Sequence, residues 1–133
     1  MILCSGAFDG LHAGHVRYLE EAKMLCQAGE PLHCAVAPDA YIQHSKGRAP
    51  GWSQADRAAT VSALRVVDGV WPQHQPTPSG LILILKPRLF VKGEDWRDRV
   101  PSIVIDACAD VGCEIRFVDT PGRHVSETIT ASA

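Results

Sequence analysis

The sequence contains no long apolar run and no concentration of basic residues. Its aliphatic stretch at residues 81–85 is too short to cross a bilayer, and Met1-Ile2-Leu3 carries no basic leader, so we expect neither membrane insertion nor secretion. The formal net charge is −2, and no Lys/Arg run is present. Because binding to a phosphate backbone needs a concentrated basic face, we expect no nucleic-acid partner.

Cysteine pairs with metal-binding or disulfide spacing are also absent. The cysteines are odd in number, lie mostly in apolar or helical stretches, and include no Cys-x-x-Cys pair. We interpret them as reduced core thiols, which indicates a cytoplasmic protein, and we predict no protein-bound metal site. They are Cys4, Cys26, Cys34, Cys108 and Cys113.

The sequence does hold enough apolar residues for one core. Hydrophobic residues make up 46% of the 133 positions. This content fits a single domain over residues 1–133, and the chain is too short for two ordinary domains.

Short apolar strands alternate with helical patterns along the chain. Strands are predicted near residues 1–4, 32–37, 66–71, 89–91 and 114–118, helices near 16–28, 53–65, 77–85 and 103–111, and a loop at 43–51. Parallel strands joined by helical crossovers indicate an α/β fold: a three-layer α/β/α, Rossmann-like, doubly wound parallel five-stranded sheet. Such sheets bind ligands at the carboxyl ends of their strands.

The turn after the first strand is rich in glycine and histidine. It reads Gly6-Ala7-Phe8-Asp9-Gly10-Leu11-His12-Ala13-Gly14-His15 and leads into a helix. Unpaired N–H groups at a helix start lie at the positive end of the helix dipole, so a phosphate can approach the main chain there. The two histidines are three residues apart, which places both imidazoles to donate to one anion.

Read as Gly-x-Phe-Asp-x-x-His-x-Gly-His, this segment resembles the signature of the cytidylyltransferase-like nucleotidyltransferases. Members of this family join a nucleotide to a phosphorylated small molecule and release pyrophosphate. The resemblance implies catalytic roles for His12 and His15, and it makes Asp9 a residue that orients the turn and a candidate phosphate or acceptor contact. The nucleotide contacts that it implies here come from Ala7, Phe8, Gly14 and His15.

Two later segments resemble further blocks of the same family, in the same order. In the first, a lysine of the loop at residues 46–50 reaches the triphosphate and an arginine on the next helix supports the site. This implies a catalytic Lys46, a nucleotide-binding Arg57 and, in Arg48, a candidate phosphate or acceptor contact. The second, Val91-Lys92-Gly93-Glu94-Asp95-Trp96, resembles the block that holds the base, which implies nucleotide contacts from Gly93, Asp95 and the stacking ring of Trp96.

Residues 122–128 resemble the last block of the family, which caps a helix that touches the nucleotide phosphates. The match implies nucleotide contacts from Ser126 and Thr128, with Arg123 as a candidate phosphate or acceptor contact. Glu127 departs from the threonine that is usual there. One alternative of another class therefore stays open, a non-catalytic nucleotide-binding module.

The resemblance also bears on the substrates. Residues 77–96 look most like the adenylyltransferase domain that makes ADP-heptose from heptose 1-phosphate, while the Asp95-Trp96 pair is shared with glycerol-3-phosphate cytidylyltransferases. This implies ATP as the donor and a phosphorylated sugar as the acceptor, with CTP and a polyol phosphate as the alternative. Mg²⁺ carried with the nucleoside triphosphate and a homodimer are implied as well.

Overall fold

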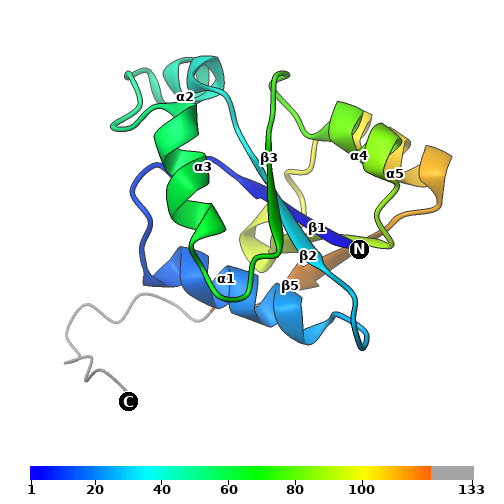
Figure 1. The fold of residues 1–133 in the computed structure, drawn as a ribbon. Helices are drawn as coiled ribbons and strands as arrows, with labels where there is room; N and C mark the ends of the chain where they lie inside the picture. The colour runs from blue at the N-terminus through cyan, green and yellow to red at the C-terminus, as the bar shows by residue number, and fades with distance from the viewer. Residues whose placement is uncertain (121–133) are drawn as a thin grey trace.

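The computed structural model describes residues 1–120, in which helices cover both faces of a parallel sheet (Figure 1). In chain order the elements are β1 (Ile2–Gly6), α1 (Ala13–Met24), β2 (Leu32–Val36), α2 (Asp39–Lys46), α3 (Gln54–Ser62), β3 (Gly69–Pro72), α4 (Ser79–Leu85), β4 (Leu89–Gly93), the 3-10 turn η1 (Glu94–Trp96), α5 (Ser102–Val111) and β5 (Glu114–Val118).

The sheet has five strands in the order β3-β2-β1-β4-β5, and each neighbouring pair is parallel. The chain first builds outward from β1 to β3 and then crosses to the other side of β1 to add β4 and β5. The strand order therefore reverses between β1 and β4, and ligands of doubly wound sheets bind at such a point. This confirms the predicted fold class.

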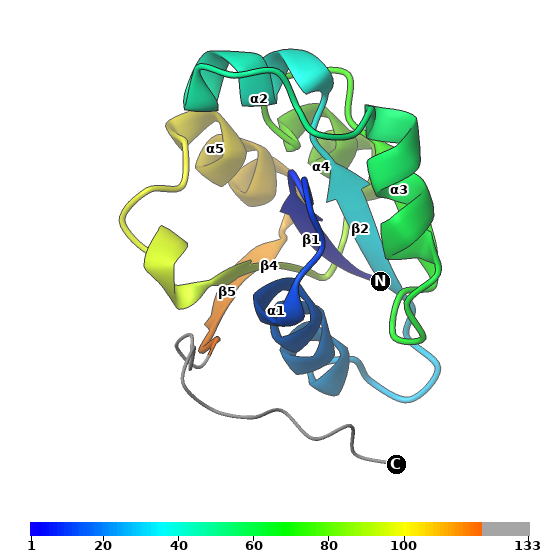
Figure 2. The ribbon, with the colours of Figure 1, turned by 90° about the vertical axis from the view of Figure 1, so that its left-hand side faces the viewer.

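Two apolar cores lie on opposite faces of the sheet. Ile2 and Cys4 of β1 pack with α1 and α3, whereas Leu3 packs with α4 and α5. Figure 2 shows the same division, with α1 and α3 on one side and α4 and α5 on the other. Because β1 is buried on both faces, it reads as a continuous apolar run in the sequence.

The predicted loop at residues 43–51 is partly wrong, because its first residues are helical. Helix α2 ends only at Lys46, where Gly47 adopts a left-handed backbone with φ 65°. Only Ile42 of this helix is buried, so its exposed polar residues carry almost no apolar periodicity.

Two other boundaries also differ from prediction. Helix α1 ends at Met24, not near residue 28, because the chain turns at Leu25, whose carbonyl oxygen accepts a hydrogen bond from Arg88. Strand β3 begins at Gly69, because Asp68 lies in the connection before it, where its carboxylate accepts the N–H of Leu32.

The predicted start of α3, the predicted end of α5 and the prediction of reduced cysteines are confirmed. Ser53 caps α3 by accepting the N–H of Asp56, and Gly112 ends α5 in a left-handed conformation. All five cysteines are free thiols. Among the helices of residues 1–120, none has the length and apolarity to cross a membrane.

Candidate active site

A cavity of about 700 Å³ opens at the carboxyl ends of the strands, over the reversal point between β1 and β4. Its volume lies within the range of roughly 300–1,000 Å³ that is usual for small-molecule sites. It brings together predicted site residues from segments far apart in the chain. Those that line it are Ala7, Phe8, Asp9, His12, Gly14, His15, Lys46, Gly93, Asp95 and Trp96.

His12 and His15 cap helix α1 through their Nδ1 atoms. The N–H of Gly14 donates to His12 Nδ1 at 3.0 Å, and the N–H of His12 donates to His15 Nδ1 at 3.2 Å. The two rings stack with centroids 3.8 Å apart. A nitrogen that accepts a hydrogen bond carries a lone pair, so each neutral ring holds its proton on Nε2. The helix start therefore presents two imidazole N–H donors side by side.

The glycines of this turn are required by close packing. A Cβ atom on Gly14 would lie 2.8 Å from the ring of His12, and one on Gly6 would lie 2.9 Å from the ring of Phe8. Phe8 itself has a left-handed backbone with φ 52°, which is unfavourable for a residue with a side chain. Its ring is buried and lies 5.2 Å from that of His15, so core packing holds the strained turn in place.

The carboxylate of Asp9 joins the turn after β1 to the loop before α3. It accepts the N–H groups of Gly51 and Trp52 and a hydrogen bond from Arg48 at 2.9 Å. These donors, Gly51 first, lower the pKa of Asp9 from 3.8 to about 2. Arg48 therefore pairs with Asp9 and does not line the cavity, so its candidate contact with phosphate stays a prediction.

We expect Asp9→Asn to change how stability depends on pH. A carboxyl with a depressed folded-state pKa stabilises the fold above its unfolded pKa, here about 4. That contribution disappears as the pH falls through the folded pKa, at about 2. In urea denaturation, the wild type should be more stable than Asp9→Asn at pH 6, and the difference should shrink between about pH 4 and about pH 2.

The comparison isolates Asp9 because other acid-sensitive groups are common to both proteins. Glu30, for example, also has its pKa lowered to about 2, chiefly by the hydrogen bond from Arg88. A difference in stability that stayed constant over this pH range would contradict the role given to Asp9.

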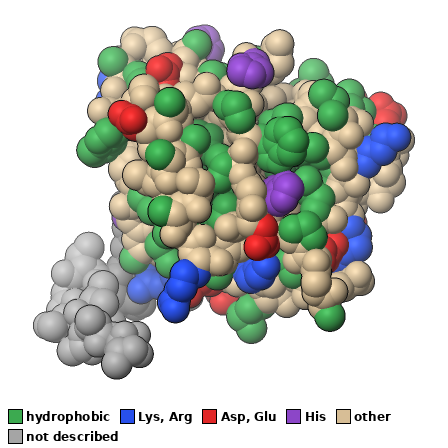
Figure 3. All heavy atoms as spheres, viewed as in Figure 1, with side chains coloured by type: hydrophobic (Ala, Val, Ile, Leu, Met, Phe, Trp, Pro, Cys, Tyr) green, Lys and Arg blue, Asp and Glu red, His purple; other side chains and the backbone are tan. Residues whose placement is uncertain are grey.

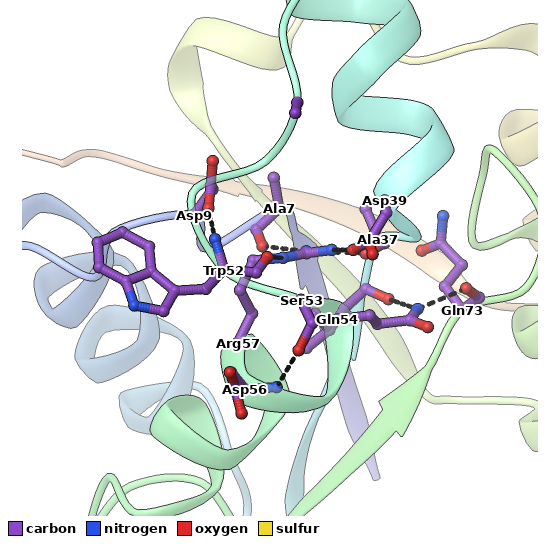
Figure 4. A network of polar contacts seen from close by, with 12 residues as sticks. Ala7, Asp9, Ala37, Asp39, Trp52, Ser53, Gln54, Asp56, Arg57 and Gln73 are labelled. Carbon is purple, nitrogen blue, oxygen red and sulfur yellow. Dashed lines mark hydrogen bonds and ion pairs between the residues drawn. The ribbon is translucent and has the colours of Figure 1, made fainter.

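The side chain of Arg57 forms hydrogen bonds with three segments next to the turn after β1 (Figure 4). Its side chain is 1% exposed and donates to the carbonyl oxygens of Ala7, Ala37 and Trp52. A further donor reaches the carboxylate of Asp39 at 2.7 Å. Arg57 thus supports the site by fixing the turn, the end of β2 and the start of α3 relative to one another. The direct nucleotide contact predicted for it stays a prediction.

The other end of the cavity is formed by β4 and η1. Lys92 lies there and is almost fully buried, with its ammonium 4.5 Å from the centroid of the Trp96 ring. The guanidinium carbon of Arg99 lies 5.3 Å from the same centroid. A base that stacks on Trp96 must therefore share the ring with these cations.

Comparisons with known proteins agree with this geometry. The profile of the family described as cytidylyltransferase-like matches residues 3–116. The chain belongs to this family. The match runs from β1 into β5 and so includes every element that contributes to the cavity.

Individual relatives are similar to this chain over part of their own length. The bifunctional protein HldE of Shewanella sp. (strain ANA-3) is 42% identical over 98 residues, which are 73% of this chain and 20% of that protein. HldE of Aliarcobacter butzleri (strain RM4018) is 35% identical over 130 residues, which are 97% of this chain and 26% of that protein. The chain thus spans about a fifth to a quarter of the length of these curated relatives.

Solved structures show the same fold. The lipopolysaccharide core biosynthesis protein from Thermoplasma volcanium GSS1 has a TM-score of 0.70 at 26% identity, over 89% of this chain and 95% of that chain. A protein with unknown function from Archaeoglobus fulgidus has a TM-score of 0.69 at 20% identity, over 97% of this chain and 94% of that chain, and shows the fold alone. Together, the family match and the relatives support a nucleotidyltransferase domain.

Several cavity residues of this cytidylyltransferase-like domain were not singled out as site residues from the sequence. Tyr41 lies on α2 one turn before Lys46, but the loop predicted for the following residues gave no reason to place it there. Lys92 lies in the family-like block at residues 91–96, for which the resemblance implied roles only for Gly93, Asp95 and Trp96. Gln73, in the loop after β3, also lines the cavity. The missed lining side chains that carry polar atoms are Ser5, Tyr18, Tyr41, Thr77, Lys92 and Thr120.

The predicted residues of the last family block, Arg123, Ser126 and Thr128, lie outside the described residues, as does Glu127. On the face that Figure 3 draws, the Lys and Arg side chains of the described part lie in separate places and form no continuous basic patch. Within residues 1–120, no three His, Cys, Asp or Glu side chains come together as metal ligands.

Proposed function

We propose that this domain transfers a nucleoside monophosphate from ATP to a phosphorylated sugar of the heptose 1-phosphate kind, with release of pyrophosphate. The observation that carries the proposal is the pair of stacked imidazoles at the start of α1, which line a cavity at the strand-order reversal. The positive end of the helix dipole adds to the attraction for phosphate. The resemblance of residues 77–96 to the ADP-heptose-forming domain favours ATP and a sugar 1-phosphate.

The chemistry needs charge stabilisation and no general base. An oxygen of the acceptor phosphate, already anionic at neutral pH, attacks the α-phosphorus in line. A new phosphorus–oxygen bond forms, the α–β phosphoanhydride bond breaks, and pyrophosphate leaves with the electron pair. Negative charge grows on the α-phosphoryl oxygens and on the leaving group. Donors such as His12, His15 and Lys46 fit this task, because fixed donors act where that charge develops.

The cavity also fits a magnesium ion that arrives with its nucleotide. Of the two carboxylates that line it among residues 1–120, Asp9 accepts hydrogen bonds from Gly51, Trp52 and Arg48, which leaves Asp95 as the acidic side chain for a cation or its water ligands. Mg²⁺ usually binds through substrate phosphates and waters with few protein ligands, and it would neutralise charge on the triphosphate.

A pyrophosphate-release assay tests the proposal. ATP and CTP are each combined with a heptose 1-phosphate, with another sugar 1-phosphate and with glycerol 3-phosphate. We expect release with ATP and a sugar 1-phosphate acceptor. Release with CTP and glycerol 3-phosphate would instead establish the cytidylyltransferase alternative, which the Asp95-Trp96 pair favours. Nucleotide binding without release across the whole panel would establish a non-catalytic module. The homodimer stays a prediction, to be measured by analytical ultracentrifugation.

Trp96→Ala tests the base site. If the ring stacks on the base, the substitution should weaken nucleotide binding by about 1–3 kcal/mol, for ATP and CTP alike, because every base offers a π-face. Titration calorimetry with both nucleotides on the wild type and the variant measures this. Trp52→Ala is a matched control, because Trp52 is exposed and does not line the cavity. Unchanged affinity in Trp96→Ala would remove the stacking role, and tighter CTP binding by the wild type would contradict the choice of ATP.

A further inference from the structure

Lys92 is a buried cation, and its contacts among residues 1–120 are with a neutral serine and two aromatic rings. It lies near the end of β4 and is 8% exposed. Its ammonium donates to the Ser5 carbonyl oxygen at 2.9 Å and lies 3.5 Å from Ser5 Oγ. The rings of Trp96 and Tyr18 have their centroids 4.5 Å and 5.8 Å from it. Among residues 1–120, no carboxylate lies within 4.0 Å of the ammonium.

The groups around this ammonium do not supply the missing negative charge. Burial raises the pKa of Cys4 to about 12 and raises those of Cys34 and Tyr18 well above their usual values, so all three are neutral at pH 7. Asp95 acts on Lys92 by charge, and it is exposed. Burial of an ammonium without a counter-ion is unfavourable. The burial of Lys92 is explained if an anionic ligand supplies the counter-ion.

Strands β1 and β4 separate next to Lys92. The ladder between β1 and β4 ends at the pair Cys4 and Val91. Just beyond that pair, the Tyr18 hydroxyl accepts the N–H of Ser5 and donates to the carbonyl oxygen of Val91. The hydroxyl thus takes the place of a direct bond between the strands. We call this hydroxyl, inserted between Ser5 and Val91, the tyrosine wedge. Lys92 lies beside it and lines the cavity, so the remaining N–H donors of Lys92 are available to a ligand there.

Lys92 and the histidines lie toward opposite faces of the sheet. Ser5 and Lys92 follow Leu3 and Phe90 by two residues, and Leu3 and Phe90 pack against α4 and α5. Side chains two apart on a strand share a face, so the Lys92 side chain leaves β4 on the α4 and α5 side, and its ammonium reaches the Ser5 carbonyl oxygen, 5.8 Å from the centroid of the Tyr18 ring of α1. His12 and His15 belong to α1, which covers the other face.

We propose that Lys92 binds the phosphate group of the acceptor, on the side of the cavity opposite the imidazole pair. The inference rests on the proposed function. In-line displacement places the attacking oxygen and the leaving pyrophosphate on opposite sides of the α-phosphorus. If the triphosphate lies at the start of α1, the attacking phosphate lies toward α4 and α5, where Lys92 is. The ammonium orients that phosphate, whose oxygen attacks as described above, and it neither gains nor loses a proton in the step.

The test compares Lys92→Met with Lys86→Met, which removes the same charge from an exposed residue outside the cavity. Steady-state pyrophosphate release gives the KM of the acceptor, and calorimetry gives the Kd of ATP. We expect Lys92→Met to raise the acceptor KM by about 10–100-fold, the factor for a hydrogen bond to a charged group. The Kd of ATP should change less than about twofold, and Lys86→Met should match the wild type.

A second measurement does not depend on turnover. Removal of a buried unpaired charge should leave the ligand-free Tm unchanged or higher. Inorganic phosphate and a sugar 1-phosphate should raise the Tm of the wild type and of Lys86→Met more than that of Lys92→Met, because a ligand stabilises only the protein that binds it. Lys92→Arg, which keeps the charge, should retain part of this shift.

The outcomes separate the two proposals. An unchanged acceptor KM in Lys92→Met, with normal pyrophosphate release, would overturn the inference and leave the proposed function standing. A weakened Kd for ATP with the acceptor KM unchanged would assign Lys92 to the donor nucleotide and also overturn it. If the wild type releases no pyrophosphate but Lys92→Met still loses the phosphate-dependent rise in Tm, the proposed function fails and the anion site remains.

Discussion

Replacing His15 by alanine should lower kcat by about two to three orders of magnitude, the usual effect of losing one donor to developing charge. The structure gives the reason. His15 Nδ1 is held by the N–H of His12, so the His15 ring is fixed against that of His12 at the positive end of α1. His12→Ala should have an effect of similar size. Pyrophosphate release under saturating substrates measures both.

Loss of a helix cap must be separated from loss of chemistry in these variants. His12→Ala removes the acceptor for the Gly14 N–H, which should cost about 1 kcal/mol of stability. That loss would lower Tm slightly and would leave the enzyme folded at the assay temperature. His44→Ala is the control, since His44 is exposed on α2 and outside the cavity. Normal turnover in His15→Ala would remove the imidazole pair from the mechanism.

Arg57→Met should destabilise the protein by about 3–5 kcal/mol, because it leaves buried carbonyl groups without donors. The carbonyl oxygens of Ala7, Ala37 and Trp52 would each lose a hydrogen bond. Asp39 is half exposed, so the loss of its ion pair should add little. Thermal unfolding should show a fall in Tm of roughly 10–20 °C.

Arg65→Met is a matched control, which tests whether loss of any arginine near α3 lowers the Tm. Arg65 is exposed and lies just beyond α3, so Arg65→Met should leave Tm almost unchanged. If Arg57→Met unfolded at the wild-type temperature, the carbonyl groups would have found other donors. The role of Arg57 in fixing the turn would then be wrong.

Strands and the first turn could be predicted from the sequence because their signals are local. Strand β1 is buried on both faces and therefore apolar throughout, and the turn after it carries its histidines and glycines within ten residues. Helix α2 could not be predicted in the same way, because only Ile42 is buried and the polar residues around it resemble a loop. Where burial is slight, periodicity carries little information.

The parts of the site that escaped prediction depend on contacts between distant segments. Lys92 has no role of its own in the block at residues 91–96 until the fold places Ser5 beside it, 87 residues away in the chain. Arg48 looks like a free loop cation until Asp9 is found to accept from it across 39 residues. In both cases the sequence supplies the charge, and the fold supplies the partner that decides its role.

The tyrosine wedge at the end of the β1–β4 ladder has a kinetic consequence. Since the Tyr18 hydroxyl bonds both strands where they part, the crevice is already open before any substrate arrives. A ligand that enters breaks no bond between the strands, and the free energy of keeping them apart is part of folding, not of binding. Association should then be limited by diffusion and orientation, with no slow opening phase before the encounter complex forms.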